Sequence, residues 1–165
     1  MKKITFTFFL SAFALTVLSQ EFEVPGNYKF ERAEDYSTYE PAVLKGITWI
    51  TATPLDQQEA KRKKVNAFLL EWLSGSPYVH LELKKEIVTF VNSPDLLMVF
   101  MGGWAKYSLE SKDFNNKVAG SLAGIEAVIG FYSRNKNAIK KDKNVEKYIK
   151  MKESGTLKEY VEKNA

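Results

Sequence analysis

The chain has 165 residues, no cysteine and one histidine, and its 24 basic residues outnumber its 20 acidic ones. This length fits one domain and excludes a barrel enzyme or a two-domain dehydrogenase. Because cysteine is absent, a disulfide framework, a thiolate zinc site, a cysteine nucleophile and an iron–sulfur cluster are all excluded. A hydrophobic content of 45%, with 13% aromatic residues, indicates a folded domain rather than a disordered chain.

The beginning of the chain has the pattern of a secretory signal peptide. Lys2 and Lys3 precede an uncharged apolar run, 4–18, which is too short for a comfortable membrane span. Ser19 is small enough for the position before a signal-peptidase cut, so we predict cleavage between Ser19 and Gln20. An uncleaved membrane anchor is the alternative, and the short run disfavours it. The expected mature chain, in the periplasm or outside the cell, has no transmembrane span.

The remaining chain divides into a leading segment, 20–37, and a helical domain, 38–165. Pro41 suits the first turn of a helix because its missing amide costs nothing there. Apolar residues follow at helical spacing, and Pro54 ends the run.

Asp56 and Glu59 have the spacing of a capping box, which predicts the start of a second helix. Its expected buried residues recur at helical spacing, namely Val65, Phe68, Leu69, Trp72 and Leu73. The basic run 61–64 is expected on the exposed face, and Gly75 closes the helix. Apolar and polar residues then alternate over 78–83, which indicates a short extended piece. The segment 86–91 has β-branched residues that favour a strand but lies between helices, and we favour an extended piece followed by a helical turn.

A central buried αα-hairpin is predicted over 94–132. Ser93 as N-cap and Pro94 at the first helical position mark the start of its first helix, 96–109. The second helix, 114–132, is apolar on two opposite faces, which is typical of a helix covered on all sides. Its glycines, and Gly102 and Gly103 in the first helix, fit close helix–helix packing better than a phosphate-binding loop.

Two short helices end the chain. Asp142 is the expected N-cap of the first, and Thr156 opens a capping box for the second, after a break at Gly155. These signals together predict an all-α single domain of five or six helices around the central hairpin.

Parts of this pattern resemble small exported all-helical proteins of unassigned function. The run 137–142, the segment 152–157 and the helix start 93–97 resemble the tail and the middle helix start of such proteins. The resemblance implies an exported all-helical fold, and it implies no activity or functional residue.

Two ionisable residues are weak catalytic candidates. Glu126 lies at the edge of the main apolar face of the second hairpin helix, where a carboxylate must be paired, protonated or directed into a polar pocket near Trp104 or Tyr107. We favour a salt bridge or a tyrosine hydrogen bond over an active-site acid. His80 cannot build a multi-histidine zinc site alone, and as a general base it would need Glu82 to orient it.

A basic cluster over 134–152 contains eight basic and two acidic residues. Within it, the candidates for binding an anionic partner are Lys140, Lys141, Lys143 and Lys147. The alternative is that these lysines form only a solvated surface without a partner. The modest net charge disfavours nucleic acid as the partner.

No metal-ligand cluster or cofactor motif occurs in the sequence, so we expect neither metal nor cofactor. The function we favour is that of a non-enzymatic, exported helical binding or envelope-associated protein. Its partner would be an anionic envelope component or another protein. The alternative is a small hydrolase that uses acidic residues, because a carboxylate pair has no fixed spacing in sequence.

Overall fold

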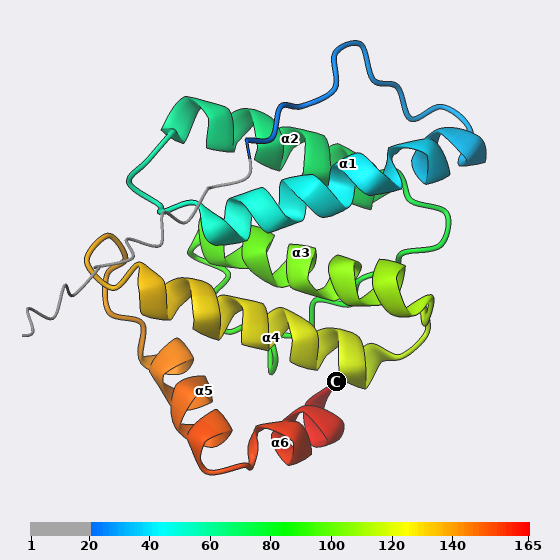
Figure 1. Ribbon diagram of the computed structural model, residues 1–165. Coiled ribbons are helices and arrows are strands. Elements are labelled where there is room, and N and C mark those ends of the chain that lie inside the picture. The colour runs from blue at the N-terminus through cyan, green and yellow to red at the C-terminus, as the bar shows by residue number, and fades with distance from the viewer. Residues whose placement is uncertain (1–20) are drawn as a thin grey trace, which may run out of the picture.

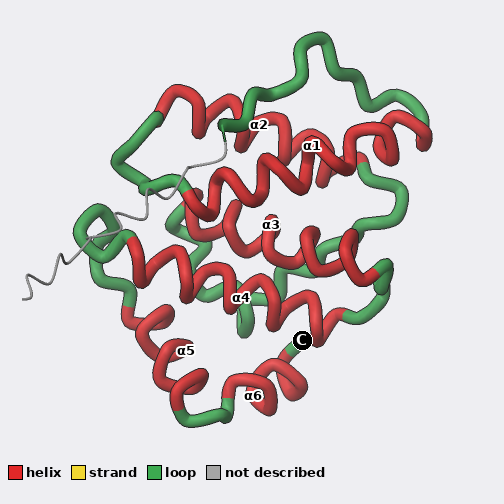
Figure 2. Tube along the Cα trace, viewed as in Figure 1, coloured by secondary structure: helices red, strands yellow, loops and turns green. Residues whose placement is uncertain are grey.

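The computed structural model describes residues 21–165, and these residues form six helices and no strand (Figure 1, Figure 2). The helices are α1 (Ala33–Ala52), α2 (Glu59–Gly75), α3 (Pro94–Ser111), α4 (Lys117–Arg134), α5 (Lys143–Glu153) and α6 (Leu157–Asn164). The prediction of a single all-α domain is therefore confirmed. The expected signal peptide and its cleavage site between Ser19 and Gln20 lie outside the described residues. Within 21–165, no helix combines the length and apolar character needed to span a membrane.

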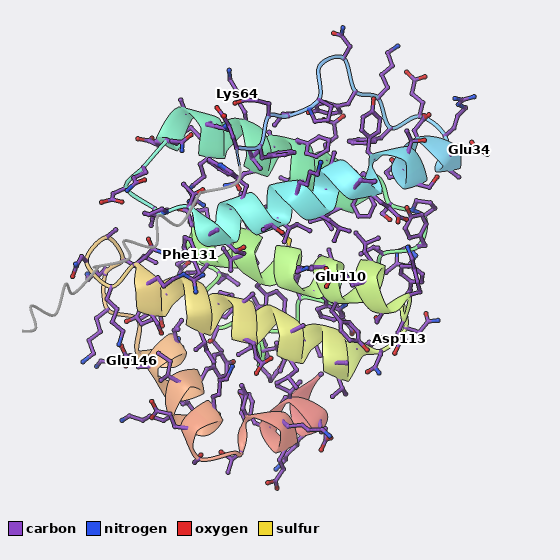
Figure 3. The ribbon with its side chains drawn as sticks, in the orientation of Figure 1. Glu34, Lys64, Glu110, Asp113, Phe131 and Glu146 are labelled. Atoms are coloured by element: carbon purple, nitrogen blue, oxygen red, sulfur yellow. The ribbon has the colours of Figure 1, made fainter. Side chains whose placement is uncertain are left out.

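The predicted central hairpin is formed by α3 and α4, which share the most extensive helix–helix contact of the described chain. Helices α1 and α2 pack against α3 on one side, and α5 and α6 pack against α4 on the other (Figure 1). Charged residues such as Glu34, Lys64 and Glu110 are exposed on the outer surfaces of α1, α2 and α3 (Figure 3). The hydrophobic core therefore surrounds the hairpin.

Glycines let α3 and α4 approach closely. A Cβ atom at Gly103 would lie 2.9 Å from the backbone oxygen of Ala123, and one at Gly124 would lie 2.8 Å from that of Phe100. Such distances are too short for real Cβ contacts, so only glycine fits at these two positions. Helix–helix packing thus accounts for these glycines, as the sequence indicated.

Helix α1 begins earlier than predicted. It starts at Ala33, so the leading segment 20–37 is helical over its last five residues, and Pro41 lies inside the helix rather than in its first turn. The start is stabilised by the Asp35 carboxylate, which accepts hydrogen bonds from the amides of Arg32 (2.9 Å) and Glu31 (3.1 Å). Proline is tolerated at position 41 because this side of the helix is exposed, where water can solvate the carbonyl that lacks a helical partner.

The capping box predicted at Asp56 is not formed. A turn closed by the Gln57 amide and the Pro54 carbonyl (3.2 Å) contains Asp56, and α2 begins only at Glu59. The helix starts after Gln58, whose backbone is left-handed with φ 53°. The turn therefore moves the carboxylate of Asp56 away from the first amides of the helix.

The connection from α2 to α3 contains turns and irregular backbone but no strand (Figure 2). Over 78–83, Val79 is buried while Leu83 is 48% exposed, so the alternating pattern does not produce one covered face. The following piece forms a helical turn, because the Val88 amide donates to the Lys84 carbonyl at 2.8 Å.

Of the two caps predicted for the last helices, one is formed. Asp142 caps α5 by accepting hydrogen bonds from the amides of Asn144 (2.8 Å) and Val145 (3.2 Å). Thr156 precedes α6 without a capping bond, and its hydroxyl lies 2.9 Å from that of Ser154 instead. The chain reverses at this point through Gly155, with φ 73°, which is a conformation that glycine adopts readily.

Candidate functional site

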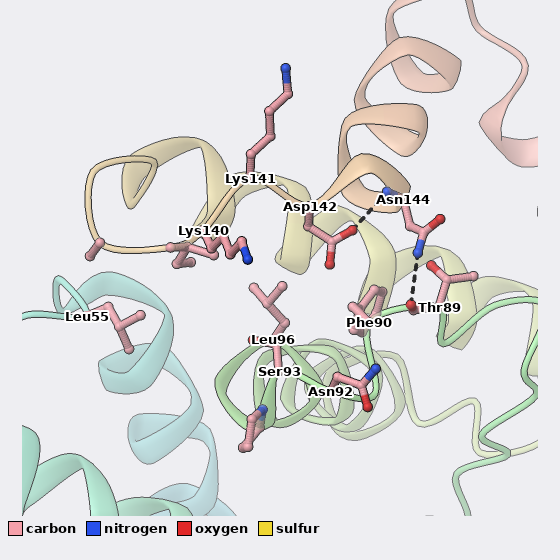
Figure 4. A pocket seen from close by; sticks show the side chains of 13 residues that line it. Leu55, Thr89, Phe90, Asn92, Ser93, Leu96, Lys140, Lys141, Asp142 and Asn144 are labelled. Carbon is pink, nitrogen blue, oxygen red and sulfur yellow. Dashed lines mark hydrogen bonds between the residues drawn. The ribbon is translucent and has the colours of Figure 1, made fainter.

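A groove of about 450 Å³ lies where the loop after α4 faces the start of α3 (Figure 4). We call it the Lys140 groove. Its walls come from the turn before α2, the segment that precedes α3, the first turn of α3, and the loop that joins α4 to α5. Apolar side chains make up part of its lining, namely Leu55, Phe90, Pro94, Leu96, Ala138 and Ile139. Polar and charged side chains complete it, namely Thr89, Asn92, Ser93, Lys140, Lys141, Asp142 and Asn144.

Side-chain hydrogen bonds hold the walls of the Lys140 groove in place. The buried Asn135, at the end of α4, accepts a hydrogen bond from the Leu55 amide at 2.8 Å and donates to the Phe131 carbonyl at 2.8 Å. On the other side, the Asn144 amide group donates to the Thr89 carbonyl at 3.1 Å. Three segments that are far apart in sequence are thereby fixed around one opening.

The start of α3 adds a partial positive charge to the Lys140 groove. Ser93 occupies the N-cap position, as predicted, but its hydroxyl caps no amide. Pro94 has no amide, and those of Asp95 and Leu96 donate to no described residue. Unpaired amides at a helix N-terminus attract negative charge, because the peptide dipoles of the helix point the same way.

Two neighbouring lysines differ in how their side chains lie relative to the Lys140 groove. The Lys140 side chain extends over the opening toward Leu96, whereas Lys141 points away from it (Figure 4). Lys140 forms no ion pair with a described residue. The one acidic side chain of the lining, Asp142, already accepts the two amide hydrogen bonds at the start of α5. The Lys140 ammonium therefore has no direct carboxylate partner among the described residues, although the Asp142 charge lies in the same lining.

The other lysines of the predicted basic cluster lie elsewhere. A second concavity, of about 420 Å³ on α5, is lined by Lys141, Lys143, Glu146, Lys147 and Lys150. The Lys147 ammonium lies 5.2 Å from the centre of the Tyr160 ring, a cation–π contact between α5 and α6. Glu146 accepts a hydrogen bond from Tyr132 at 3.0 Å and lies 3.7 Å from the Lys136 ammonium. Three of the four candidate lysines therefore line this concavity, and Lys140 lies apart from it, at the Lys140 groove.

Glu126, the catalytic candidate, lies on the surface of α4. It is exposed, and its carboxylate pairs with the Lys152 ammonium at 2.9 Å. This agrees with the salt-bridge interpretation and places Glu126 outside the Lys140 groove.

His80 is exposed on the rim of a shallow apolar hollow of about 260 Å³ between α2 and the segment that follows it. Glu82, its expected orienting acid, instead pairs with the Lys117 ammonium at 2.6 Å, and this contact lowers the pKa of the Glu82 carboxyl. The two side chains share no hydrogen bond in the described chain. Residues 21–165 also hold no group of three or more potential metal ligands.

All three tryptophans are buried core residues. Trp72 is fully buried and donates its indole N–H to the Tyr36 carbonyl at 3.0 Å, and Trp104 packs against Gly120. Trp49 lies beneath the guanidinium of Arg62, whose centre is 5.7 Å from the Trp49 ring. An apolar binding surface built around these tryptophans is therefore excluded.

Arg62 is the residue that sequence analysis missed. The basic run 61–64 was expected on the exposed face, yet Arg62 is only 4% exposed. Its guanidinium donates to the carbonyls of Ile50 (2.9 Å) and Thr53 (2.6 Å), so it caps the end of α1. Burial lowers the pKa of this guanidinium, and the charge of Asp95 opposes that shift.

Helical spacing does provide a signal for this burial. Arg62 precedes Val65 by three residues and Leu69 by seven, which places it on the buried face of α2. Its neighbours Lys63 and Lys64 are exposed, as predicted.

The fold defines the chain as a small all-α protein with a cationic groove at one end of its central hairpin. No protein-family model matches this chain, and neither the curated proteins nor the solved structures include a significant match.

Proposed function

We propose that this chain is an exported, non-enzymatic binding protein that holds a ligand with a negatively charged group in the Lys140 groove. The observation that carries the proposal is the ammonium of Lys140, which forms no ion pair within residues 21–165 and extends over an opening that also contains the uncapped start of α3. A lysine and a helix N-terminus that face the same space both favour an anion. Export is supported by the signal-peptide pattern at the beginning of the sequence.

The apolar lining narrows the class of ligand. Phe90 and Leu96 are buried core residues, and Leu55 and Ile139 pack beside them. A ligand that combines an anionic head with an apolar part can cover the partly buried Leu55 and Ile139 while its head lies at Lys140. An anionic envelope component has this chemistry, whereas a simple inorganic anion contacts the polar part of the lining and leaves the apolar part uncovered.

Binding of octanoate, with 1-octanol as the uncharged counterpart, tests the proposal. Isothermal titration of the described chain should detect octanoate binding that 1-octanol does not match. Lys140→Ala should weaken octanoate binding about fivefold, which corresponds to about 1 kcal/mol for one lysine–carboxylate contact.

Lys141→Ala is the matched control, because it removes the same charge from the adjacent residue, which points away from the opening. It should change octanoate affinity by less than about twofold at 0.15 M salt. Equal effects of the two substitutions would show that the lysines act only through net charge, and the groove proposal would then be wrong.

A further inference from the structure

A second cavity of about 390 Å³ lies next to the Lys140 groove, between the start of α2 and the start of α3. We call it the Arg62 cavity. Its lining consists of Leu55, Glu59, Arg62, Lys63, Asn66, Pro94 and Asp95. Leu55 and Pro94 also line the Lys140 groove, so the two spaces are neighbours on either side of these side chains. A ligand that passes over Leu55 and Pro94 would reach both spaces.

Two buried atoms of the lining have no hydrogen-bond partner within the described chain. They are the Nε atom of Arg62, a donor, and the Oδ1 atom of Asn66, an acceptor. The Arg62 side chain cannot turn away to satisfy Nε, because its terminal nitrogens are held by the carbonyls of Ile50 and Thr53. Its ring contacts hold it further, since Trp49 and Phe131 have centres 5.7 and 5.5 Å from the guanidinium.

Unpartnered buried polar atoms are uncommon, because desolvation without a hydrogen bond is unfavourable. Here the two residues that carry the unpartnered donor and acceptor lie one helical turn apart, and both belong to the lining of the Arg62 cavity. A group that presents both an acceptor and a donor would satisfy them together.

The charges around the Arg62 cavity favour a neutral group. Glu59 and Lys63 pair with each other at 2.7 Å, and Asp95 is the acidic residue that acts on Arg62. Two acidic and two basic side chains therefore balance in the lining, unlike the lining of the Lys140 groove. A secondary amide is neutral, and its C=O accepts while its N–H donates.

We infer that the Arg62 cavity binds an amide group of the same ligand whose anionic group lies at Lys140. The amide C=O accepts from Arg62 Nε, and the amide N–H donates to Asn66 Oδ1. Ligands with an amide near a carboxylate include short peptides and N-acyl amino acids. This inference rests on the proposed function for the position of the carboxylate, whereas the amide contacts are independent of it.

Four probes distinguish binding in the Arg62 cavity from binding in the Lys140 groove, and they distinguish a peptide ligand from an N-acyl amino acid. N-acetyl-trialanine has amides and a carboxylate, and its C-terminal amide form lacks the carboxylate. Decanoate has a carboxylate without an amide, and N-decanoylglycine combines one amide with a long acyl chain. Isothermal titration of the described chain gives the affinity of each probe, and the tighter of the acetylated peptide and the acylglycine identifies the source.

The Nε–H proton of Arg62 is a direct reporter, because NMR resolves arginine Nε–H groups that are buried. Its resonance should shift when the amidated peptide is added and should not shift with decanoate. This measurement needs no substitution, so it tests the amide contact even where a variant fails to fold.

Asn66→Leu removes the acceptor with little change in volume. It should weaken binding of both peptide forms about fivefold and leave decanoate unchanged. Asn66→Asp keeps a carboxylate oxygen as acceptor and should retain peptide binding. The thermal midpoint of Asn66→Leu should equal or exceed that of the parent, because an unsatisfied buried acceptor is replaced by an apolar group. A purely structural role for Asn66 would instead lower the midpoint.

The outcomes distinguish this inference from the proposed function. The inference is overturned if the Arg62 Nε–H resonance does not shift at millimolar amidated peptide. It is also overturned if Asn66→Leu leaves the peptide affinity unchanged. Loss of peptide binding in Asn66→Leu together with no effect of Lys140→Ala supports the amide site and overturns the proposed position of the carboxylate.

Discussion

Two glycine-to-alanine substitutions in α4 test the packing of the central hairpin. At Gly124, an added Cβ atom would lie 2.6 Å from a ring carbon of Phe100 and 2.8 Å from the Phe100 carbonyl oxygen. At Gly130, the nearest atom would be a terminal nitrogen of Arg134 at 3.3 Å, which is the flexible end of a side chain. The same chemical change therefore meets rigid backbone in one case and a movable group in the other.

The magnitude follows from two opposing contributions. Replacing glycine by alanine inside a helix stabilises it by about 1 kcal/mol, and this gain is common to both sites. Overpacking a filled core costs about 1–3 kcal/mol, and this cost applies only at Gly124. The free energy of unfolding of Gly124→Ala should therefore lie about 1–3 kcal/mol below that of Gly130→Ala. Relative to the parent protein, Gly130→Ala should be stabilised by up to about 1 kcal/mol.

Urea unfolding, followed by circular dichroism at the helix band and by tryptophan fluorescence, measures both values. The two probes should coincide, which would indicate a two-state transition. Melting temperatures should differ in the same direction, by about 2–4 °C for each kcal/mol in a domain of this size. Equal stability of the two variants would refute the close contact between Gly124 and Phe100, and with it the glycine-mediated packing of α3 on α4.

Four further predictions concern other parts of the chain. Burial raises the pKa of Tyr148 above its ordinary value of 10.0, as it does for Tyr78, so the folded chain keeps these phenolic protons longer than the unfolded chain does. The stability from this difference is complete below about pH 10 and is lost as the pH rises further; urea midpoints should fall there, and by less in Tyr148→Phe. Asp142→Ala should lower the free energy of unfolding by about 1 kcal/mol, because the α5 cap is lost, and an unchanged urea midpoint would contradict the cap. The same substitution should strengthen octanoate binding, because it removes a negative charge from the groove. Arg62→Met should destabilise the fold by about 2–4 kcal/mol in urea titrations, because it leaves the Ile50 and Thr53 carbonyls without donors, and a neutral effect would contradict that role. Intact mass of the exported product should place its first residue at Gln20 or within a few residues of it, and recovery of the full 165-residue chain from the cytosol would contradict export.

Much of the helix pattern could be predicted because its signals are local. The cap at Asp142, the proline at position 94 and the glycine at 155 each act on the residues beside them. Turns form where the capping boxes at Asp56 and Thr156 were expected: the Gln57 amide donates to the Pro54 carbonyl, and the Thr156 amide donates to the Met151 carbonyl. The early start of α1 was missed because Asp35 caps it from within the helix, on the C-terminal side of the first amides.

The candidate site could be predicted only in part. Lys140 and Lys141 are adjacent in a basic run, and the sequence gives no reason to distinguish them. The position of the loop against α3 directs one over the groove and the other away (Figure 4). Arg62 was read as one charge of a solvated run, although its helical register with Val65 and Leu69 indicated the buried face.

The sequence by itself determined the all-helical class, the buried hairpin with its glycine contacts, and most helix ends, because short-range hydrogen bonds and hydrophobic periodicity are set by neighbouring residues. Only the tertiary structure decided which charged and polar groups bond to one another and which face a cavity. Asn135 reaches the Leu55 amide across 80 positions of sequence, and Arg62 reaches carbonyls of another helix. Contacts of this kind depend on how helices pack in three dimensions, and no local pattern encodes them.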